Sequence, residues 1–145
     1  MKILTFDPGK KTGYSVWKTT PNGPEVIEAG VVLNYQQLIK VMENHCMADF
    51  CVYEGFARAN ASTGDQLQAI AMTGAIYCMA EYHSMKVRKQ YPAQRKGYIP
   101  FAKQTPLPTT VKSEDRPHVI DAVAHGLRFF DKEGFPCPQL QSLTS

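Results

Sequence analysis

The sequence predicts an α/β fold in which a mixed β-sheet is flanked by helices. Short β-like runs follow one another near the N-terminus with only tight turns between them, whereas the later β-like runs are separated by helical patterns. Tight turns allow the first three strands to pair as an antiparallel meander, while the fourth and fifth strands need crossovers. At 145 residues the chain is long enough to bury the core of one such domain.

The first three strands are predicted from apolar runs and the turn residues between them. Residues 1–6 form a mainly apolar run, and two glycines bracket a polar turn before the alternating run at 14–17. A Pro-Asn-Gly-Pro turn at 21–24 separates this run from a third one at 25–33. These three segments form the predicted meander.

Helices and strands alternate in the remainder of the predicted domain. The expected elements are helix 35–46, strand 48–56, helix 62–84, strand 86–92, an irregular loop at 93–113 and helix 114–130. The face of the long helix that we expect to pack on the sheet comprises Leu67, Ile70, Ala71, Gly74, Tyr77, Cys78 and Glu81. Residues 131–145 are rich in proline and polar side chains, which predicts a C-terminal tail after a single domain at 1–130.

The net charge of +3 is unevenly distributed along the chain. Seven basic residues and no acid occur between Lys86 and Ser113, whereas the rest of the chain has nine basic residues and thirteen acids. Such segregation is typical of proteins that bind phosphate backbones, and the interleaved Tyr91, Tyr98 and Phe101 are suited to stacking on bases. The alternative is a solvated loop, because blocks of like charge often have no partner.

Composition disfavours several other classes of protein. No apolar run is long enough to span a membrane, and the N-terminus lacks the layout of a signal or transit peptide, so we expect a cytoplasmic protein. The four cysteines form no CxxC pair and three of them lie in apolar stretches. This predicts buried reduced thiols rather than disulfides or a zinc site.

Two of the predicted strands end in an acid. Asp7 follows the first strand, just ahead of a Pro-Gly turn, and Glu54 closes the fourth. Because sites assemble outside the carboxyl ends of parallel strands, the two carboxylates meet if their strands are neighbours. The alternatives are an Asx turn capped by Asp7 and a Glu54 that faces solvent.

The last predicted helix adds a histidine and a third acid. His118 and Asp121 are three residues apart, so both side chains lie on one face of that helix. Together with the strand-end acids they make an oxygen-rich ligand set, which suits Mg²⁺ or Mn²⁺ better than zinc. Two such ions would hold an attacking water and the leaving 3′ oxygen of a phosphodiester. The alternative is that His118 and Asp121 only cap the first turn of the helix.

Four motifs occur in an order that resembles a known family: FDPGKKTGYSVW, VYEGF, YPAQRK and HVIDAVAHGL. In sequence and spacing they are similar to the RuvC family of Holliday-junction resolvases, within the RNase H-like superfamily, and especially to its compact bacteriophage and bacterial members. The resemblance covers residues 1 to about 130. It implies an RNase H-like fold and a metal-dependent nuclease for four-way junctions. Gly9 and Gly13 of the first motif are then expected to let the backbone pass close to a phosphate.

The resemblance also implies roles for individual residues. The metal-binding acids of the family correspond to Asp7, Glu54 and Asp121. His118 stands at a fourth position, which holds either His or Asp in relatives. The family's lysine near the scissile phosphate, four residues after a proline, corresponds to Lys96. Two Mg²⁺ or Mn²⁺ ions per active site are implied, with Asp7 bridging both.

Three features depart from the family pattern. Phe56 lies two residues after the glutamate, whereas the family's aromatic wedge lies three after it, so a junction-opening role for Phe56 is not expected. The stretch between Lys96 and His118 is shorter and richer in proline than in bacterial resolvases, which leaves the substrate range open. His125 stands where an apolar residue is usual. Because it lies two turns from His118, we interpret it as a packed histidine or one that supports a ligand from behind, and not as a ligand.

The sequence therefore predicts a metal-dependent endonuclease for branched DNA, four-way junctions above all, without a nucleotide cofactor. The alternatives are a flap or fork nuclease of the same fold, a non-catalytic DNA-binding module, and an actin-like phosphotransferase, although the last needs a second glycine-rich phosphate loop. We expect a homodimer through the helix at 62–84, with Met72, Ile76 and Met79 as candidates for its interface. The alternative is that these three residues are core, as an apolar helix face more often is. The predicted DNA contacts are Lys10, Lys11, Arg58, Lys89, Arg95, Lys96 and Lys103.

Overall fold

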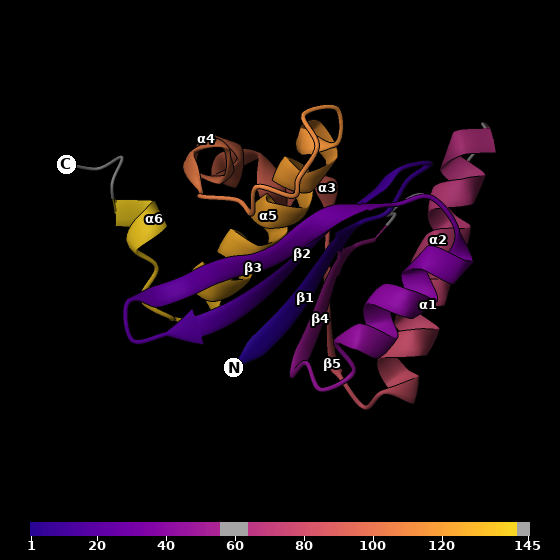
Figure 1. Ribbon diagram of the computed structural model, residues 1–145, viewed down its shortest axis with the longest axis horizontal. Coiled ribbons are helices and arrows are strands. Elements are labelled where there is room, and N and C mark those ends of the chain that lie inside the picture. Colours follow the sequence, from indigo (N-terminus) through magenta and orange to yellow (C-terminus); the bar gives the residue numbers. More distant parts are fainter. Residues whose placement is uncertain (56–63, 142–145) are drawn as a thin grey trace.

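The computed structural model describes residues 1–55 and 64–141, which form a five-stranded sheet with helices on both faces (Figure 1). The strands are β1 (Lys2–Asp7), β2 (Thr12–Thr20), β3 (Gly23–Val32), β4 (Phe50–Glu54) and β5 (Lys86–Gln90). Their order across the sheet is β3-β2-β1-β4-β5. β2 pairs antiparallel with both β1 and β3, whereas β4 pairs parallel with both β1 and β5. The predicted meander and the two crossover strands are confirmed.

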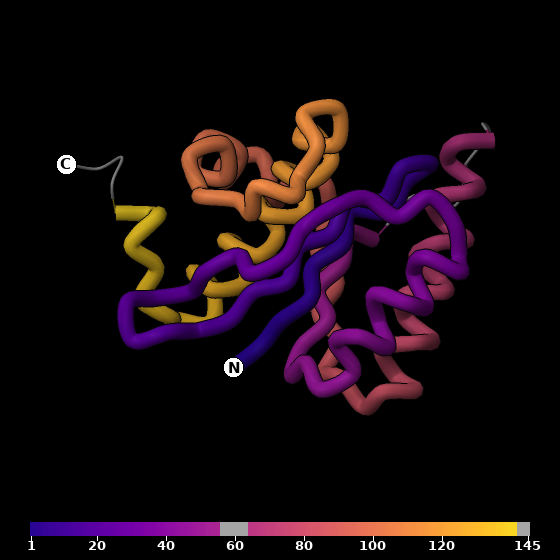
Figure 2. The backbone as a smooth tube through the Cα atoms, in the orientation of Figure 1, coloured from indigo at the N-terminus to yellow at the C-terminus, as the bar shows by residue number. Residues whose placement is uncertain are grey.

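Helices cover both faces of this sheet (Figures 1 and 2). α1 (Tyr35–Asn44) and α2 (Gly64–Tyr82) pack on one face, and α5 (Arg116–Lys132) crosses the other. The remaining helices are short: α3 (Pro92–Arg95), η1 (Lys96–Tyr98), α4 (Ile99–Gln104) and α6 (Pro138–Gln141). Figure 2 shows that the segment between β5 and α5 lies on the same side of the sheet as α5.

The segment after β5 is more helical than its sequence indicated. We expected an irregular loop at 93–113 because of its prolines, but α3, η1 and α4 occupy most of its first half. Pro92 and Pro100 stand in the first turns of α3 and α4, where the missing backbone N–H has no partner to lose. The prolines therefore begin helices here instead of breaking them.

The buried face of α2 is opposite to the predicted one. Met72 and Ile76 are 2% and 0% exposed, and Met79 packs against the same core cluster, between α2 and the sheet. Burial removes Met72 and Ile76 from any dimer interface, and Met79 is partly covered by the same core, so the prediction that these residues form the interface was wrong. The exposed face of α2 consists of the residues that we expected to be buried, namely Leu67, Ile70, Ala71, Gly74, Tyr77, Cys78 and Glu81.

α5 lies close to the sheet because of one glycine and one buried hydroxyl. A Cβ atom at Gly126 would come within 2.4 Å of the Trp17 indole nitrogen, so a side chain there would push the helix away. The Thr5 hydroxyl on β1 donates a buried hydrogen bond to the Ala122 carbonyl oxygen at 2.8 Å. This bond determines which part of α5 lies over the ends of the central strands.

The first turn of α5 touches β2 at Gly13. A Cβ atom on Gly13 would lie 2.0 Å from the carbonyl oxygen of His118, which is far inside contact distance. Gly13 therefore makes room for the backbone of α5, and the expectation that it serves the approach of a phosphate was wrong. The corresponding role of Gly9 stays a prediction.

The chain beyond residue 130 packs on the domain. α5 continues to Lys132, and Cys137 and Leu140 pack into the core on the α5 side of the sheet. The Gln139 amide donates to the carbonyl oxygen of Pro24 at 2.7 Å. Up to residue 141, the segment expected to be a tail is thus part of the folded unit.

The four cysteines are free thiols. Cys51 and Cys137 are buried, whereas Cys78 is exposed on α2, so burial of the thiols was only partly predicted. Within residues 1–55 and 64–141, no helix is both long and apolar enough to cross a membrane.

Candidate functional site

Three parallel strands end side by side at one edge of the sheet. In the pairing of β1 with β4, Phe6 lies opposite Tyr53, and in that of β4 with β5, Glu54 lies opposite Gln90. Asp7, Glu54 and Gln90 are therefore neighbours at this edge, as expected for the two acids. Glu54 and Gln90 are almost fully buried.

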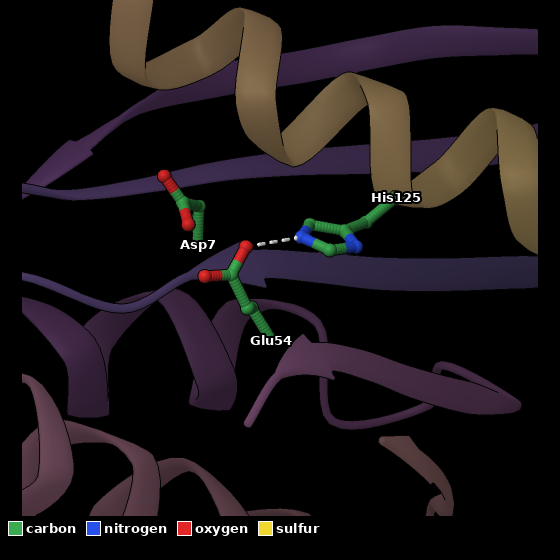
Figure 3. A group of neighbouring side chains, drawn as sticks. All are labelled: Asp7, Glu54 and His125. Carbon is green, nitrogen blue, oxygen red and sulfur yellow. Dashed lines mark hydrogen bonds and ion pairs between the residues drawn. The ribbon is translucent and has the colours of Figure 1, made fainter. Parts of the chain in front are cut away.

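α5 brings His125 to the same edge (Figure 3). One potential ligand atom from each of Asp7, Glu54 and His125 lies within 4.8 Å of the other two. The His125 ring is 0% exposed, and its Nε2 lies 2.9 Å from Oε2 of Glu54. We expected His125 to be packed or to support a ligand from behind, and not to be a ligand itself. It is packed and bonded to Glu54, because the middle of α5 lies over the ends of β1 and β4.

Gln90 determines how the His125 imidazole is presented. The Gln90 amide nitrogen donates to the His125 carbonyl oxygen at 3.3 Å, which leaves the amide oxygen 2.7 Å from Nδ1 of the ring. An amide oxygen only accepts, so Nδ1 donates to it, and Nε2 is the ring nitrogen that faces Glu54. Histidines that bind metal ions are commonly held from behind in this way. The sequence offered no local signal for Gln90, which ends a predominantly polar strand.

Arg95 enters this cluster from α3. Its Nη1 donates to Oε2 of Glu54, and its Nε lies 3.4 Å from Oδ1 of Asp121. Only 23% of the Arg95 side chain is exposed. Asp121 therefore joins the cluster by way of Arg95. The DNA contact predicted for Arg95 stays a prediction, since its partners in the protein alone are acids.

Crowding of the carboxylates shifts their pKa values in opposite directions. Burial and the negative charge of Glu54 raise the pKa of Asp7 to about 8, an effect that Asp121 increases and Arg95 opposes. Burial also disfavours ionisation of Glu54, but the hydrogen bond from His125 and the charge of Arg95 outweigh it and lower the pKa of Glu54. Near neutral pH, Asp7 therefore retains a proton that it shares with Glu54.

His118 stands apart from this cluster. Together with Asp7, Lys10 and Lys11 it lines an open pocket of about 490 Å³. The metal-ligand group found among the described residues contains Asp7, Glu54 and His125, without His118. The four side chains predicted as ligands are thus divided: Asp7 and Glu54 meet, Asp121 is linked to them through an arginine, and His118 lines the neighbouring pocket.

Basic side chains line pockets on both sides of the acids. Lys10 and Lys11 belong to the pocket that contains Asp7. A second open pocket, of about 540 Å³, is lined by Asp121 together with Lys103 and Arg116. Three of the predicted DNA contacts therefore lie next to candidate metal-binding acids, where a phosphate backbone would need them.

The other predicted DNA contacts do not line these two pockets, or they lie outside the described residues. Lys96 is exposed on η1, and in the described part of the chain no ion pair joins it to the acids, so its role stays a prediction. The Lys89 ammonium lies 5.6 Å from the centre of the Tyr91 ring. Arg58 and Phe56 lie outside the described residues.

The side chains of the site fit a hard divalent cation. Asp7 and Glu54 offer carboxylate oxygens, which are the ligands preferred by Mg²⁺ and Mn²⁺, and His125 offers one nitrogen. Asp121 supplies a further carboxylate nearby, on the far side of Arg95. Two of the acids predicted as ligands, Asp7 and Glu54, belong to this group together with His125, and the ligand roles of His118 and Asp121 stay predictions.

In fold, the chain is similar to Holliday-junction resolvases. RuvC of T. thermophilus in complex with a Holliday junction substrate has a TM-score of 0.68 and 16% identity, over 92% of this chain and 97% of that one. A second RuvC structure from Thermus thermophilus has a TM-score of 0.65 and 18% identity, over 92% and 97% of the two chains. The Fowlpox virus resolvase in complex with its substrate junction DNA has a TM-score of 0.62 and 14% identity, over 90% and 99%.

No protein-family model and no curated protein sequence matches the chain. The structural similarity covers nearly the whole of each chain at low sequence identity. It confirms the RuvC-like, RNase H-like fold that the four sequence motifs implied.

Proposed function

We propose that this protein is a metal-dependent endonuclease that hydrolyses phosphodiester bonds in branched DNA, with four-way junctions as its main substrate. The observation that carries the proposal is the meeting of Asp7, Glu54 and His125 at one edge of the sheet, although they come from three separate elements. The similarity in fold to RuvC and to a viral resolvase, both solved with Holliday junctions, supports branched DNA as the substrate class.

Each side chain of the cluster has a task in this proposal. Asp7, Glu54 and His125 would hold Mg²⁺ or Mn²⁺, and Asp121 would contribute to a second ion. The bound metal supplies an activated water and neutralises charge at the phosphate. Asp7 releases its proton when the metal binds, and Gln90 keeps Nε2 of His125 directed at the metal-binding side of the cluster. Hydrolysis consumes one water and leaves a 5′-phosphate and a 3′-hydroxyl end.

The basic side chains around the acids position the DNA backbone in this proposal. Lys10 and Lys11 contact phosphates on the Asp7 side, and Lys103 contacts them on the Asp121 side. Lys96 stabilises charge on the scissile phosphate, as its equivalent does in the family that the sequence resembles.

We further propose that the protein acts as a homodimer through the exposed face of α2. A four-way junction has two-fold symmetry and requires two paired cuts, which a two-fold dimer supplies. Leu67, Ile70 and Tyr77 are 57%, 39% and 46% exposed on one helix face. A contiguous apolar face of this kind is typical of an interaction surface.

The first experiment compares the wild-type protein with Asp7→Asn on labelled four-way junction, flap and linear duplex DNA. Each reaction is run with Mg²⁺, with Mn²⁺ and with EDTA. We expect symmetric cuts in the junction that require a metal and are absent from Asp7→Asn. A matched control is Glu43→Gln, which removes one negative charge from the exposed side of α1.

The outcomes of this experiment are distinct. Cutting of the junction by Asp7→Asn at the wild-type rate would exclude the proposed site. Cutting of flaps in preference to junctions would keep the nuclease and change the substrate. Tight, metal-independent junction binding without any cutting, by protein shown to be folded, would favour a DNA-binding module.

A further inference from the structure

The guanidinium group of Arg95 lies among the acids that the proposed function assigns to metal binding. Nη1 donates to Glu54, and Nε lies 3.4 Å from Asp121. Burial lowers the pKa of Arg95, but the neighbouring acids, Glu54 foremost, outweigh it and raise this pKa. The side chain of Arg95 is more than three-quarters buried, a position that is costly for a cation unless carboxylates surround it.

Arg95 uses an atom that a metal ion would also need. Oε2 of Glu54 accepts from Nη1 of Arg95 and lies 2.9 Å from Nε2 of His125. This oxygen therefore faces two nitrogen atoms at the centre of the ligand group. A divalent cation bound between Glu54 and His125 would lie within a few ångströms of the guanidinium, and like charges at that separation repel strongly in a partly buried site.

The short helix α3 holds the backbone of Arg95 in place while leaving the side chain free to change rotamer. α3 begins at Pro92, and the backbone N–H of Tyr91 donates to the side-chain oxygen of Gln94 at 2.9 Å. Arg95 is the last residue of α3 and reaches the acids with a long side chain. Withdrawal of its guanidinium therefore requires rotation about side-chain bonds and no rearrangement of the sheet edge.

We propose that Arg95 is a resident cation of the metal-free site, which neutralises Glu54 and Asp121 and must withdraw from Glu54 before a divalent ion binds there. This inference rests on the proposed function, since it assumes a metal site at these acids. Arg95 is then a positioning residue that acts on the ligands. It keeps the carboxylates together when no metal is bound and lowers the affinity of the empty site for divalent ions.

The test measures binding of Mn²⁺ to the full-length protein without DNA, from the electron paramagnetic resonance signal of free Mn²⁺. Competition by Arg95 predicts that Arg95→Gln binds Mn²⁺ about tenfold more tightly than wild type, or more. The matched control is Lys96→Gln, which removes the same charge from the next residue and should alter the affinity by less than about twofold because its side chain is exposed.

A second variant and a second measurement distinguish a change in Mn²⁺ affinity from a failure of Arg95→Gln to fold. Arg95→Lys keeps the charge but has no guanidinium to bridge two carboxylates, so we expect an affinity between those of wild type and Arg95→Gln. The rise in melting temperature on adding Mn²⁺ should follow the same order, since at a fixed Mn²⁺ concentration tighter binding stabilises the folded state more.

The inference and the proposed function fail in different ways. Equal Mn²⁺ affinity in wild type and Arg95→Gln, or an equal gain in Arg95→Gln and Lys96→Gln, would overturn the role of Arg95 and leave the metal site intact. Weaker Mn²⁺ binding by Arg95→Gln would also overturn it. If neither wild type nor Arg95→Gln binds Mn²⁺, both the inference and the metal-dependent nuclease are refuted.

Discussion

Neutralising Asp7 is expected to stabilise the metal-free protein, and to do so increasingly as the pH rises. Burial and the charge of Glu54 raise the pKa of Asp7 from 3.8 to about 8. Between these two pH values the folded protein retains a proton that the unfolded chain has lost. The free energy of unfolding of the wild type therefore falls with rising pH across this window, as far as Asp7 contributes. The asparagine side chain in Asp7→Asn is uncharged at every pH, so the free energy of unfolding of this variant lacks the decline.

The size of the effect follows from the shift in pKa. Each pH unit corresponds to about 1.4 kcal/mol, so a shift from 3.8 to about 8 sets an upper limit of about 6 kcal/mol. Asp7 also lines an open pocket and is opposed by the charge of Arg95. Since solvent and a neighbouring cation reduce such effects, we expect a gain of about 2 to 3 kcal/mol for Asp7→Asn above pH 8.

The assay is urea unfolding followed by circular dichroism, in EDTA, from about pH 5.5 to about pH 9. Glu54 stays ionised throughout this range because its pKa is lowered, so its titration does not contribute to the difference. We expect the curves of wild type and Asp7→Asn to diverge as the pH rises. Parallel curves would refute the reasoning, as would a wild type that gains stability relative to Asp7→Asn across this range. Glu43→Gln, on the exposed side of α1, should follow the wild type.

Four further predictions concern activity, metal binding, DNA binding and assembly. Asp121→Asn should lose junction cleavage by more than about a hundredfold and retain junction binding, as measured by electrophoretic mobility; retained cleavage would remove Asp121 from the site. Gln90→Leu should weaken Mn²⁺ binding by about 10 to 100-fold, because the His125 ring loses its orienting bond; unchanged binding would show that the orientation of His125 is irrelevant. Neutralising both Lys10 and Lys11 should lower the slope of log affinity against log salt by about 2, and Ile70→Glu should convert a dimer into a monomer in sedimentation.

The DNA-binding variant and the assembly variant each have a matched control on the same protein. Lys18→Gln removes a lysine at the opposite end of β2 and should leave the salt slope unchanged. Ile39→Glu alters an isoleucine on α1 that is 41% exposed, against 39% for Ile70, and should leave the dimer intact. An unchanged salt slope after loss of Lys10 and Lys11, or a monomeric wild type, would contradict the corresponding proposal.

Much of the fold could be predicted because its signals are local. The apolar run that ends at Asp7 and the one that ends at Glu54 are visible as strands, and short or helical connections distinguish the meander from the crossovers. The same patterns put both acids at strand ends. Once β1 and β4 are parallel neighbours, these two side chains have to meet.

The buried face of α2 could not be predicted from local sequence signals. This helix is apolar around much of its circumference, so its sequence does not distinguish Ile76, which is buried, from Tyr77, which is exposed. Only the position of the sheet and of α1 decides which side is covered. The choice between the two faces also decides which residues are available to a partner.

The sequence by itself determined the order of the elements and the two acids at the strand ends. The tertiary structure decided which other side chains join them. His125 rather than His118 faces Asp7 and Glu54, because Gly13 and the bond from Thr5 to Ala122 set how α5 lies on the sheet. Arg95 reaches Glu54 across 41 residues of sequence. Such contacts depend on the distances between packed elements, which no periodicity along one element encodes.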